Sequence, residues 1–364
     1  MKRIFAGTAA ALLAAVLFFP VSASAISAEK AVVMDAATGR VLYERRSEEE
    51  SLIASTTKIM TALVVCRQCN VLDRMRIPAE AVGIEGSSLY LREGEVLTVQ
   101  DLLYGLMLHS GNDAAVALAI YCGGTVEGFV ERMNDMAREL GLENTHFANP
   151  HGLDAPDHHS TARDLAILAA FAMEDPIFRQ TVSTKTVTAG ERSLRNHNKL
   201  LWQVAGADGV KTGYTRAAGR ILVSSATREG RRIIAVTINA PDDWRDHAAL
   251  LEEGFSRYAL TRIIGAGERV EMMPVMGGEW AFVELVAGNA FSYPIEAGER
   301  VTLEPIGSGF VYAPVVEGAD AGYAWVRING TAVGKIPLRY GKTVERLPEE
   351  EVSFWEKLFG GDRK

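Results

Sequence analysis

Three short groups of polar residues carry the candidate chemistry of this chain: Ser55-Thr56-Thr57-Lys58, Ser110-Gly111-Asn112 and Lys211-Thr212-Gly213. The first stands at the predicted start of an apolar helix, where residues three apart share one face. A serine hydroxyl needs a base to become a good nucleophile. A lysine amine serves as that base where burial or a nearby cation keeps it neutral. The spacing therefore predicts Ser55 as a nucleophile and Lys58 as its base.

Each group taken alone also has a simple structural explanation. Ser55 and Ser110 fit helix caps, and Lys211-Thr212-Gly213 fits an edge strand that ends in a glycine turn. Glycine weakens a strand unless another part of the molecule approaches its backbone closely, so Gly213 indicates such an approach. The order of the three groups, each beside the element that it needs, favours catalysis.

The surrounding pattern predicts an antiparallel sheet covered by helices, an α+β fold. Helix caps are indicated by Thr98 with Asp101 and by Thr161 with Asp164. The polar segment 146–160 is typical of a long loop. Helices are predicted over residues 55–67, 102–108, 112–121, 126–140, 161–173 and 243–258, and strands over residues 31–35, 40–43, 207–213, 220–226 and 232–239.

The composition changes after about residue 265. Short β-rich runs alternating with Gly, Pro and Glu predict a separate all-β domain over residues 268–345, following a catalytic domain over residues 26–264. In the tail, residues 349–364, Val352, Trp355 and Phe359 would share one helix face. That face fits either peripheral contact with a membrane or packing on the protein itself, and the glutamates before it oppose contact with anionic lipid.

Residues 1–25 are typical of a secretory signal peptide, with a basic start, an apolar run and Ala23-Ser24-Ala25 before the predicted cleavage. An uncleaved anchor is the alternative, although the apolar run is short for a membrane span. The formal net charge of −8 gives no general attraction to nucleic acid. We therefore expect an exported protein of the cell wall or periplasm that binds no nucleic acid.

The three motifs in this order are those of class A β-lactamases and penicillin-binding proteins. From about residue 28 to 340 the chain resembles the low-molecular-mass D-alanyl-D-alanine carboxypeptidases, which are penicillin-binding proteins. His151-Gly152-Leu153-Asp154 and Ala162-Arg163-Asp164 also carry the resemblance. It implies a β-lactamase/transpeptidase-like antiparallel sheet flanked by helices, with the all-β domain after it. It further implies removal of the terminal D-alanine from peptidoglycan stem peptides, and β-lactam antibiotics as covalent inhibitors.

The resemblance also implies roles for the catalytic residues. Ser55 attacks the carbonyl of the penultimate D-alanine, Lys58 takes its proton, and Ser110 helps to relay a proton to the leaving nitrogen. Asn112 holds Lys58 and the substrate amide. The backbone N–H groups of Ser55 and Tyr214 form the oxyanion hole, which needs two donors aimed at the developing charge.

Substrate binding falls mainly to the predicted strand. By the same resemblance, Lys211 keeps Lys58 neutral and attracts the terminal carboxylate of the substrate. Thr212 hydrogen-bonds that carboxylate, and Gly213 belongs to the same binding strand. Arg163 and Arg232 are further candidates for the carboxylate, with structural ion pairs as the alternative.

Other functions with the same chemistry stay open. A class A β-lactamase deacylates through a dedicated glutamate, and the segment 146–160 contains none. A penicillin sensor would need a membrane-spanning segment and a signalling partner. A transpeptidase, or an endopeptidase acting on cross-links, uses the same motifs, so the preference among wall substrates is not predicted.

No cofactor is expected, and no metal site. His158 and His159 lie near Asp154 and Asp157, but adjacent residues rarely bind one metal ion together. The chain also contains no HExxH motif. A surface loop is the favoured interpretation of this segment.

Cys66, Cys69 and Cys122 are the cysteines of the chain. At about 1.5 Å per residue, Cys122 lies at a similar depth along its predicted helix as Cys66 and Cys69 along theirs. A disulfide from Cys122 to either one is a hypothesis for an exported protein, and buried free thiols are the alternative.

Overall fold

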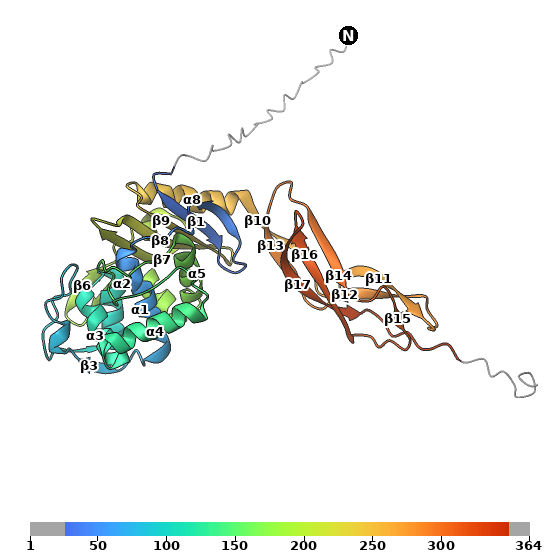
Figure 1. The fold of residues 1–364 in the computed structure, drawn as a ribbon, viewed down its shortest axis with the longest axis horizontal. Coiled ribbons are helices and arrows are strands. Elements are labelled where there is room, and N and C mark those ends of the chain that lie inside the picture. Colours follow the sequence, from blue (N-terminus) through green and yellow to red (C-terminus); the bar gives the residue numbers. More distant parts are fainter. Residues whose placement is uncertain (1–25, 349–364) are drawn as a thin grey trace, which may run out of the picture.

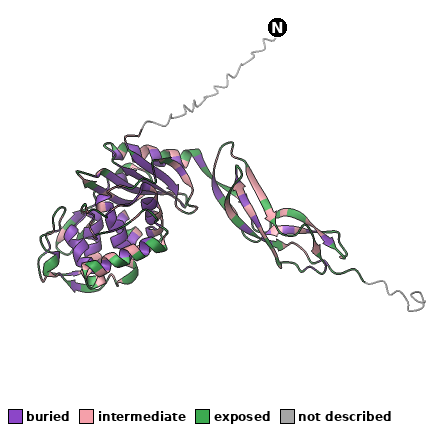
Figure 2. Cartoon of the chain, in the orientation of Figure 1, coloured by how far each residue is buried: buried purple, intermediate pink, exposed green. Residues whose placement is uncertain are grey.

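The computed structural model describes residues 26–348, so the predicted signal peptide and the predicted tail helix lie outside the described residues. Figure 1 shows an N-terminal module of sheet and helices followed by an elongated C-terminal module of strands. Buried residues are concentrated in the strands and inner helices of the N-terminal module, whereas the C-terminal module is largely intermediate or exposed (Figure 2).

A five-stranded antiparallel sheet with strand order β2-β1-β9-β8-β7 forms the centre of the N-terminal module. Helix α8 covers one face, and α5 lies on the other face with the remaining helices (Figure 1). The strands are β1 (Lys30–Asp35), β2 (Val41–Arg45), β7 (Ala207–Thr215), β8 (Gly219–Arg228) and β9 (Arg231–Ile238), and the two helices are α5 (Ala162–Ala172) and α8 (Asp243–Arg257). This arrangement confirms the predicted fold class.

Four further helices lie on the same side of the sheet as α5 (Figure 1). They are α1 (Lys58–Gln68), α2 (Val99–Leu108), α3 (Asn112–Gly123) and α4 (Val126–Glu139). The predicted caps are confirmed: Thr98 and Asp101 form a reciprocal capping box, and the Thr161 side chain accepts a hydrogen bond from the Asp164 N–H. The first helix begins near Ser55 as predicted, but its first turn is a 3-10 turn, η1 (Ala54–Thr57), which contains the serine and continues directly into α1.

Several short elements of this module were not predicted. Each is too short to show an apolar period, and most alternate between buried and exposed residues. They are β3 (Arg74–Arg76), η2 (Ala79–Ala81), β4 (Val96–Thr98), α6 (Pro176–Ser183), β5 (Thr186–Ala189), β6 (Arg192–Arg195) and α7 (Leu200–Gln203).

Within residues 26–348, no single helix is long and apolar enough to cross a bilayer, and only α3 and α4 taken together, with an 85° bend between them, meet the length and composition test.

Within residues 258–348, the C-terminal module contains strands and no helix. Its main sheet has the order β14-β16-β17-β12-β11-β15, and β10 pairs with β13 in a separate ribbon. The strands are β10 (Tyr258–Ile264), β11 (Arg269–Met276), β12 (Phe282–Ala287), β13 (Phe291–Glu296), β14 (Val301–Ile306), β15 (Val311–Tyr312), β16 (Asp320–Ile328) and β17 (Thr331–Tyr340). Strand β10 continues directly from α8, yet it pairs within the C-terminal module.

Arg40, in the turn between β1 and β2, joins the two modules. Its Nη2 lies 2.5 Å from Oε1 of Glu299, and both side chains are largely buried. Its guanidinium also lies over the rings of Tyr258 and Tyr293, 5.0 and 5.4 Å from their centroids. At the end of α8, Arg257 forms a second ion pair with Glu296, at 2.8 Å. The junction is therefore held by charged and aromatic contacts.

A disulfide joins Cys69, just beyond the end of α1, to Cys122 near the end of α3. This confirms the hypothesis of a bridge from Cys122 and selects Cys69 as its partner. Cys66 stays a free thiol, and burial raises its pKa to about 12. Because the thiolate is the reactive form, this high pKa makes Cys66 a poor nucleophile.

Candidate active site

Ser55 and Lys58 lie at the junction of η1 and α1, against strand β7. The Lys58 amine points back along the turn, and its Nζ lies 2.9 Å from Ser55 Oγ. The same nitrogen lies 2.7 Å from Asn112 Oδ1 and 2.5 Å from the backbone oxygen of His151. Three oxygens thus fix the lysine beside the serine.

The two lysines of the site are both buried. Lys58 is completely inaccessible, and burial holds its pKa well below the usual value, helped by the charge of Lys211 and opposed by Asp113. Burial alone lowers the pKa of Lys211, to about 7. Burial and the neighbouring charge of Lys211 therefore both favour the neutral form of the Lys58 amine. A neutral amine beside a serine hydroxyl can accept its proton.

The N-terminus of α3 supplies Ser110 and Asn112 to the same cleft. Asn112 is buried, its Nδ2 donates to the Glu85 carbonyl at 2.6 Å, and its backbone N–H donates to the Ser87 carbonyl at 2.7 Å. A Cβ on Gly86 would lie 2.7 Å from Asn112 Nδ2, so only glycine permits this contact. Segment 85–87 therefore fixes the orientation of the Asn112 amide.

The neighbouring Asp113 was not singled out from the sequence. Its carboxylate accepts hydrogen bonds from Ser88 Oγ at 2.7 Å and from the N–H groups of Leu89 and Leu91. It is buried at the start of α3, where a negative charge is favourable. Asp113 thereby ties the loop that borders the cleft to the helix that carries Asn112.

Strand β7 runs past the serine turn at close range. A Cβ on Gly213 would lie 3.3 Å from both the Ser55 amide nitrogen and the Ile53 oxygen. This is the close backbone approach that a glycine within a strand indicated. Lys211 Nζ donates to the Thr212 oxygen at 2.9 Å, and the Tyr214 side chain is exposed.

A cleft of about 320 Å³ opens between η1, α3 and β7. Of the predicted residues, Ser55, Ser110, Thr212, Gly213 and Tyr214 line it, while Lys58, Asn112 and Lys211 are buried. Hydrogen bonds connect Lys58 to Ser55 and Asn112, and the third motif lines the same cleft, so the structure brings residues from all three motifs together. The roles of these residues stay predictions.

Arg220 and Asp243 also line the cleft and were missed from the sequence. Nη2 of Arg220 lies 2.9 Å from each carboxylate oxygen of Asp243, which is buried while the arginine is partly exposed. Arg220 stands opposite Tyr214 in the pairing of β7 with β8. Knowledge of that strand register would have pointed to Arg220, because directly paired residues lie on the same sheet face.

The two arginines that the sequence offered for the substrate carboxylate lie in ion pairs and do not line the cleft. Arg163 pairs with Glu48, and Arg232 pairs with Asp208 at 3.3 Å. The favoured alternative, a structural ion pair, therefore describes both.

The interpretation of the segment 146–160 as a surface loop is wrong for His158, which is buried. The Ala148 N–H donates to its Nδ1, so Nε2 carries the proton and donates to Thr57 Oγ1 at 2.7 Å. Burial is the main cause that lowers the pKa of His158 to about 4, which keeps the ring neutral. Through this bond to Thr57, His158 supports the turn that carries Ser55. Among residues 26–348 no group of three or more His, Cys, Asp or Glu side chains is placed to hold a metal ion.

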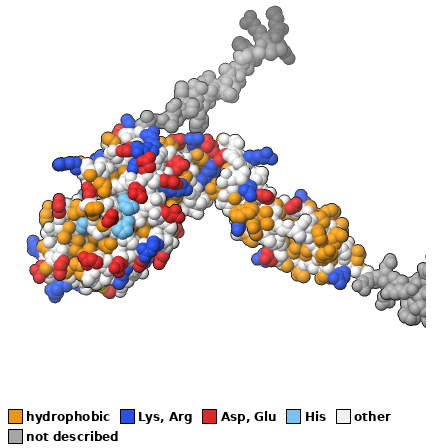
Figure 3. Space-filling model, in the orientation of Figure 1, with side chains coloured by type: hydrophobic (Ala, Val, Ile, Leu, Met, Phe, Trp, Pro, Cys, Tyr) orange, Lys and Arg blue, Asp and Glu red, His pale blue; other side chains and the backbone are white. Residues whose placement is uncertain are grey.

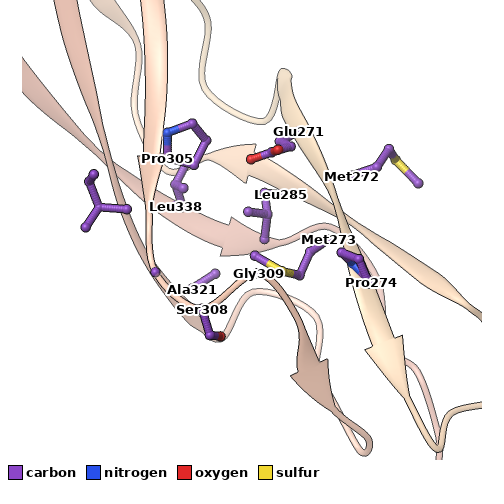
Figure 4. Close-up of a pocket in the computed structure, with 12 residues that line it drawn as sticks. Glu271, Met272, Met273, Pro274, Leu285, Pro305, Ser308, Gly309, Ala321 and Leu338 are labelled. Carbon is purple, nitrogen blue, oxygen red and sulfur yellow. The ribbon is translucent and has the colours of Figure 1, made fainter.

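The C-terminal module holds a separate cavity of about 200 Å³, shown in Figure 4. Its lining is mainly apolar, with Glu271 as its ionisable residue and Ser308 as its hydroxyl. The Ser308 hydroxyl donates to the Phe310 oxygen, and no base contacts it among the residues that line the cavity. Hydrophobic side chains gather on the surface of this module (Figure 3), including Met272, Met276 and Phe282. This cavity contains no counterpart of the Ser55 arrangement.

Two family models match the chain. One, described as D-alanyl-D-alanine carboxypeptidase, matches residues 18–242, and the other, described as penicillin-binding protein 5, C-terminal domain, matches residues 258–346. Together they cover both modules.

Individual relatives agree with the family models. The chain is 33% identical to D-alanyl-D-alanine carboxypeptidase DacF of Bacillus subtilis, over 85% of this chain and 84% of the relative. It is 35% identical to D-alanyl-D-alanine carboxypeptidase DacC of Escherichia coli, over 89% of this chain and 86% of the relative. Among solved structures, penicillin binding protein 5 from Haemophilus influenzae matches with a TM-score of 0.74 and 31% identity, over 88% of this chain and 98% of that one. The DD-transpeptidase of Streptomyces K15 matches with a TM-score of 0.61 and 36% identity, over 64% of this chain and 98% of that one.

Proposed function

The chain belongs to the family of D-alanyl-D-alanine carboxypeptidases, and we propose that it removes the terminal D-alanine of peptidoglycan stem peptides through an acyl-enzyme on Ser55. It is a serine hydrolase of peptidoglycan metabolism. The observation that carries the proposal is the buried amine of Lys58, 2.9 Å from Ser55 Oγ and held at a low pKa. This is the arrangement that turns a serine hydroxyl into a nucleophile.

The first half of the reaction forms the acyl-enzyme. Ser55 Oγ attacks the carbonyl carbon of the penultimate D-alanine while its proton passes to the neutral Lys58 amine. The negative oxygen of the tetrahedral intermediate accepts hydrogen bonds from the backbone N–H groups of Ser55 and Tyr214. The close approach of Gly213 to the Ser55 turn supports this assignment, because it brings both backbones to one side of the cleft.

The second half releases the products. Ser110 delivers a proton to the D-alanine nitrogen, the C–N bond breaks, and Lys58 replaces the proton on Ser110. A water molecule then attacks the ester carbonyl, with Lys58 again as the base, and Ser55 recovers its hydroxyl hydrogen. The position of Ser110 in the cleft wall, at the start of the helix that carries Asn112, supports this relay.

The terminal carboxylate of the substrate binds at the strand. Protonated Lys211, the Thr212 hydroxyl and the Arg220 guanidinium are its proposed partners. Arg220 suits this task because Asp243 holds it from the buried side while the guanidinium stays partly exposed to the cleft. A charged, preorganised donor binds a carboxylate more strongly than a neutral one.

Further aspects of the function follow from the same chemistry. A β-lactam ring offers Ser55 a reactive amide carbonyl, so penicillins are proposed to acylate it. The signal-peptide pattern of residues 1–25 supports an extracytoplasmic location. We divide the chain into a catalytic domain ending near residue 264 and a β-rich domain over residues 268–345, with β10 as the strand that joins them. Contact of the tail with a membrane stays a hypothesis that rests on its residue spacing.

The test is D-alanine release by residues 26–364 from a peptide that ends in Lys-D-Ala-D-Ala, beside Ser55→Ala. We expect release by the wild-type chain and none by the variant. A folded wild-type chain that forms a stable penicillin adduct without releasing D-alanine would instead indicate a sensor. Rapid turnover of the penicillin would indicate a β-lactamase.

A further inference from the structure

The first described residues of the chain, 26–28, lie at the start of helix α8 (Figure 1). Oδ2 of Asp246 accepts hydrogen bonds from the Ser27 N–H at 2.8 Å, the Ser27 hydroxyl at 2.7 Å and the Ala28 N–H at 3.1 Å. Ser27 Oγ also accepts a hydrogen bond from the Asp242 N–H at 3.0 Å. Segment 26–28 is therefore built into the first turn of α8, although Ser27 and Asp246 are 219 positions apart in the sequence.

This contact supplies a cap that α8 lacks. The Asp242 side chain, at the N-cap, makes no capping hydrogen bond. The Ser27 hydroxyl satisfies the Asp242 N–H, one of the groups at a helix start that have no partner within the helix. On strand β2, Arg45 Nη1 donates to the backbone oxygens of Ile26 and Ala28 at 3.1 and 3.0 Å. The segment is thus held through both its N–H groups and its carbonyl oxygens.

The carboxylate of Asp246 is buried, with 2% of the residue exposed. The arginines at this end of α8 pair with its neighbours: Arg220 with Asp243, and Arg245 with Asp242. Asp246 itself forms no ion pair with a lysine or arginine within residues 26–348. A buried carboxylate is normally paired, and the helix start compensates only part of its charge. A cation next to Asp246 would therefore stabilise it further.

The exported chain has such a cation at its new end. The signal-peptide pattern predicts hydrolysis of the Ala25–Ile26 bond, which leaves a carboxylate on Ala25 and a free α-amine on Ile26. With a usual pKa of about 7.7–8.0, this amine is mostly protonated at pH 7. One residue spans at most about 3.6 Å, so the Ile26 nitrogen lies within about 6.5 Å of Asp246 Oδ2. Opposite charges at this range stabilise each other.

Asp246 is coupled to the catalytic cleft through Asp243, the first residue of α8. Both carboxylate oxygens of Asp243 lie 2.9 Å from Nη2 of Arg220. Burial raises the pKa of Asp243, Arg220 lowers it, and the charge of Asp246 raises it again. An ammonium beside Asp246 offsets this repulsion. It therefore helps to keep Asp243 ionised and the guanidinium in place.

We propose that segment 26–28 positions Arg220: removal of the signal peptide places the Ile26 ammonium beside Asp246, and the segment then fixes the start of the helix that holds the guanidinium in the cleft. The inference rests on the proposed role of Arg220 in binding the substrate carboxylate. The anchor is complete only after cleavage, so the mature enzyme recognises the carboxylate better than its precursor does.

The first test concerns the α-amine and needs no catalytic activity. In the chain that starts at Ile26, the pH dependence of acetylation of this amine, followed by mass spectrometry, should give a pKa of about 8.5 or above, against the usual range of about 7.7–8.0. Asp246→Asn should return the pKa to that range. Glu29→Gln, which removes an exposed carboxylate close by in the sequence, is the matched control and should change it less. An ordinary pKa in the folded wild-type chain overturns the pairing with Asp246.

The second test compares the mature chain with one that carries a Gly-Ser dipeptide before Ile26. This extension leaves the hydrogen bonds of Ser27 and Ala28 possible and removes only the charge beside Asp246. KM for a peptide ending in a free carboxylate should rise roughly 2- to 5-fold, the scale of one partly exposed ion pair. Both kcat and the KM of a peptide ending in an amide should stay unchanged. In Arg220→Ala the extension should have no further effect on KM.

The possible failures are distinguishable. An unchanged KM for the carboxylate peptide overturns the positioning role while the proposed function stands. An equal rise of KM for both peptides, or a rise that persists in Arg220→Ala, assigns the effect to the fold as a whole and also overturns it. If the folded mature chain cleaves neither peptide, the proposed function and the positioning role both fall, and the α-amine alone still reports whether the ammonium pairs with Asp246.

Discussion

The backbone of Gly213 passes so close to Ser55 that a methyl group on the glycine would lie 3.3 Å from the serine amide nitrogen. That nitrogen is one of the two proposed oxyanion donors. Gly213→Ala should push β7 away from the turn and lower kcat by roughly 100-fold, the usual scale for loss of one such donor. Stability should fall by only about 1–3 kcal/mol, because the neighbouring atoms need to move by a few tenths of an ångström.

Steady-state kinetics and a thermal melt of the same preparation check this prediction. Gly307→Ala is the matched control, because a Cβ there meets nothing within 4 Å. An unchanged kcat in Gly213→Ala would show that the close approach has no catalytic importance.

The dependence of kcat/KM on pH should show two limbs. Activity falls on the acid side as Lys58, whose pKa is strongly lowered by burial, takes up a proton and ceases to be a base. It falls on the alkaline side as Lys211, with a pKa of about 7, loses the charge that attracts the substrate carboxylate. Lys211→Arg keeps the charge at every accessible pH and should remove the alkaline limb. An alkaline limb that persists unchanged in folded Lys211→Arg would assign it to another group.

Arg220→Ala should raise KM for peptides with a free terminal carboxylate by roughly 10- to 100-fold, since a hydrogen bond to a charged group contributes about 1.5–3 kcal/mol. Asp243→Asn should have a smaller effect of the same sign, because the guanidinium stays but loses its buried anchor. A peptide whose C-terminus is an amide serves as the control substrate. If Arg220→Ala impairs the amide and the carboxylate substrates equally, the arginine does not recognise the carboxylate.

Cys122→Ser should destabilise the protein by up to about 4 kcal/mol, because the Cys69–Cys122 bridge closes a loop with a sequence separation of 53 residues. The wild type should lose stability to the same extent when a reductant is present, and the variant should not respond to it. Chemical denaturation with and without reductant measures both, and Cys66→Ala, which keeps the bridge, is the control. A wild-type chain that is indifferent to reductant contradicts the bridge.

Arg40→Met should loosen the junction between the modules without touching the chemistry. It removes a largely buried ion pair with Glu299 and two ring contacts, and we expect proteolytic cleavage near residues 257–258, where α8 passes into β10, to become faster. Hydrolysis of the short peptide should stay within about twofold of wild type, since the β1–β2 turn that carries Arg40 lies at the opposite edge of the sheet from β7 and the cleft. Cleavage at an unchanged rate would mean that the ion pair of Arg257 with Glu296 suffices to hold the junction.

Much of the fold of the N-terminal module was predictable from short-range patterns in the sequence. The caps at Thr98 and Thr161 fixed the starts of two helices, and short, nearly continuous apolar runs identified the strands of the central sheet. The motif residues could be named because their spacing within one helix or strand is itself informative.

What could not be predicted depends on contacts between distant segments. Arg220 faces the cleft only because β8 pairs with β7 in one register and α8 brings Asp243 beneath it. His158 is buried by the fold of a polar segment that shows no apolar period. The choice of Cys69 over Cys66 depends on which face of α1 meets α3, and the sequence left that open.

Helix α8 has one further consequence. Its first residue, Asp243, holds Arg220 in the cleft, and its last, Arg257, pairs with Glu296 where the C-terminal module begins. Fifteen residues of α-helix form a rod of about 22 Å. Because an α-helix is stiffer than an irregular segment, a displacement of the C-terminal module at Glu296 would be passed along α8 to Asp243 and Arg220 at the cleft. The orientation of the C-terminal module and the position of Arg220 in the cleft are thus linked through a single helix.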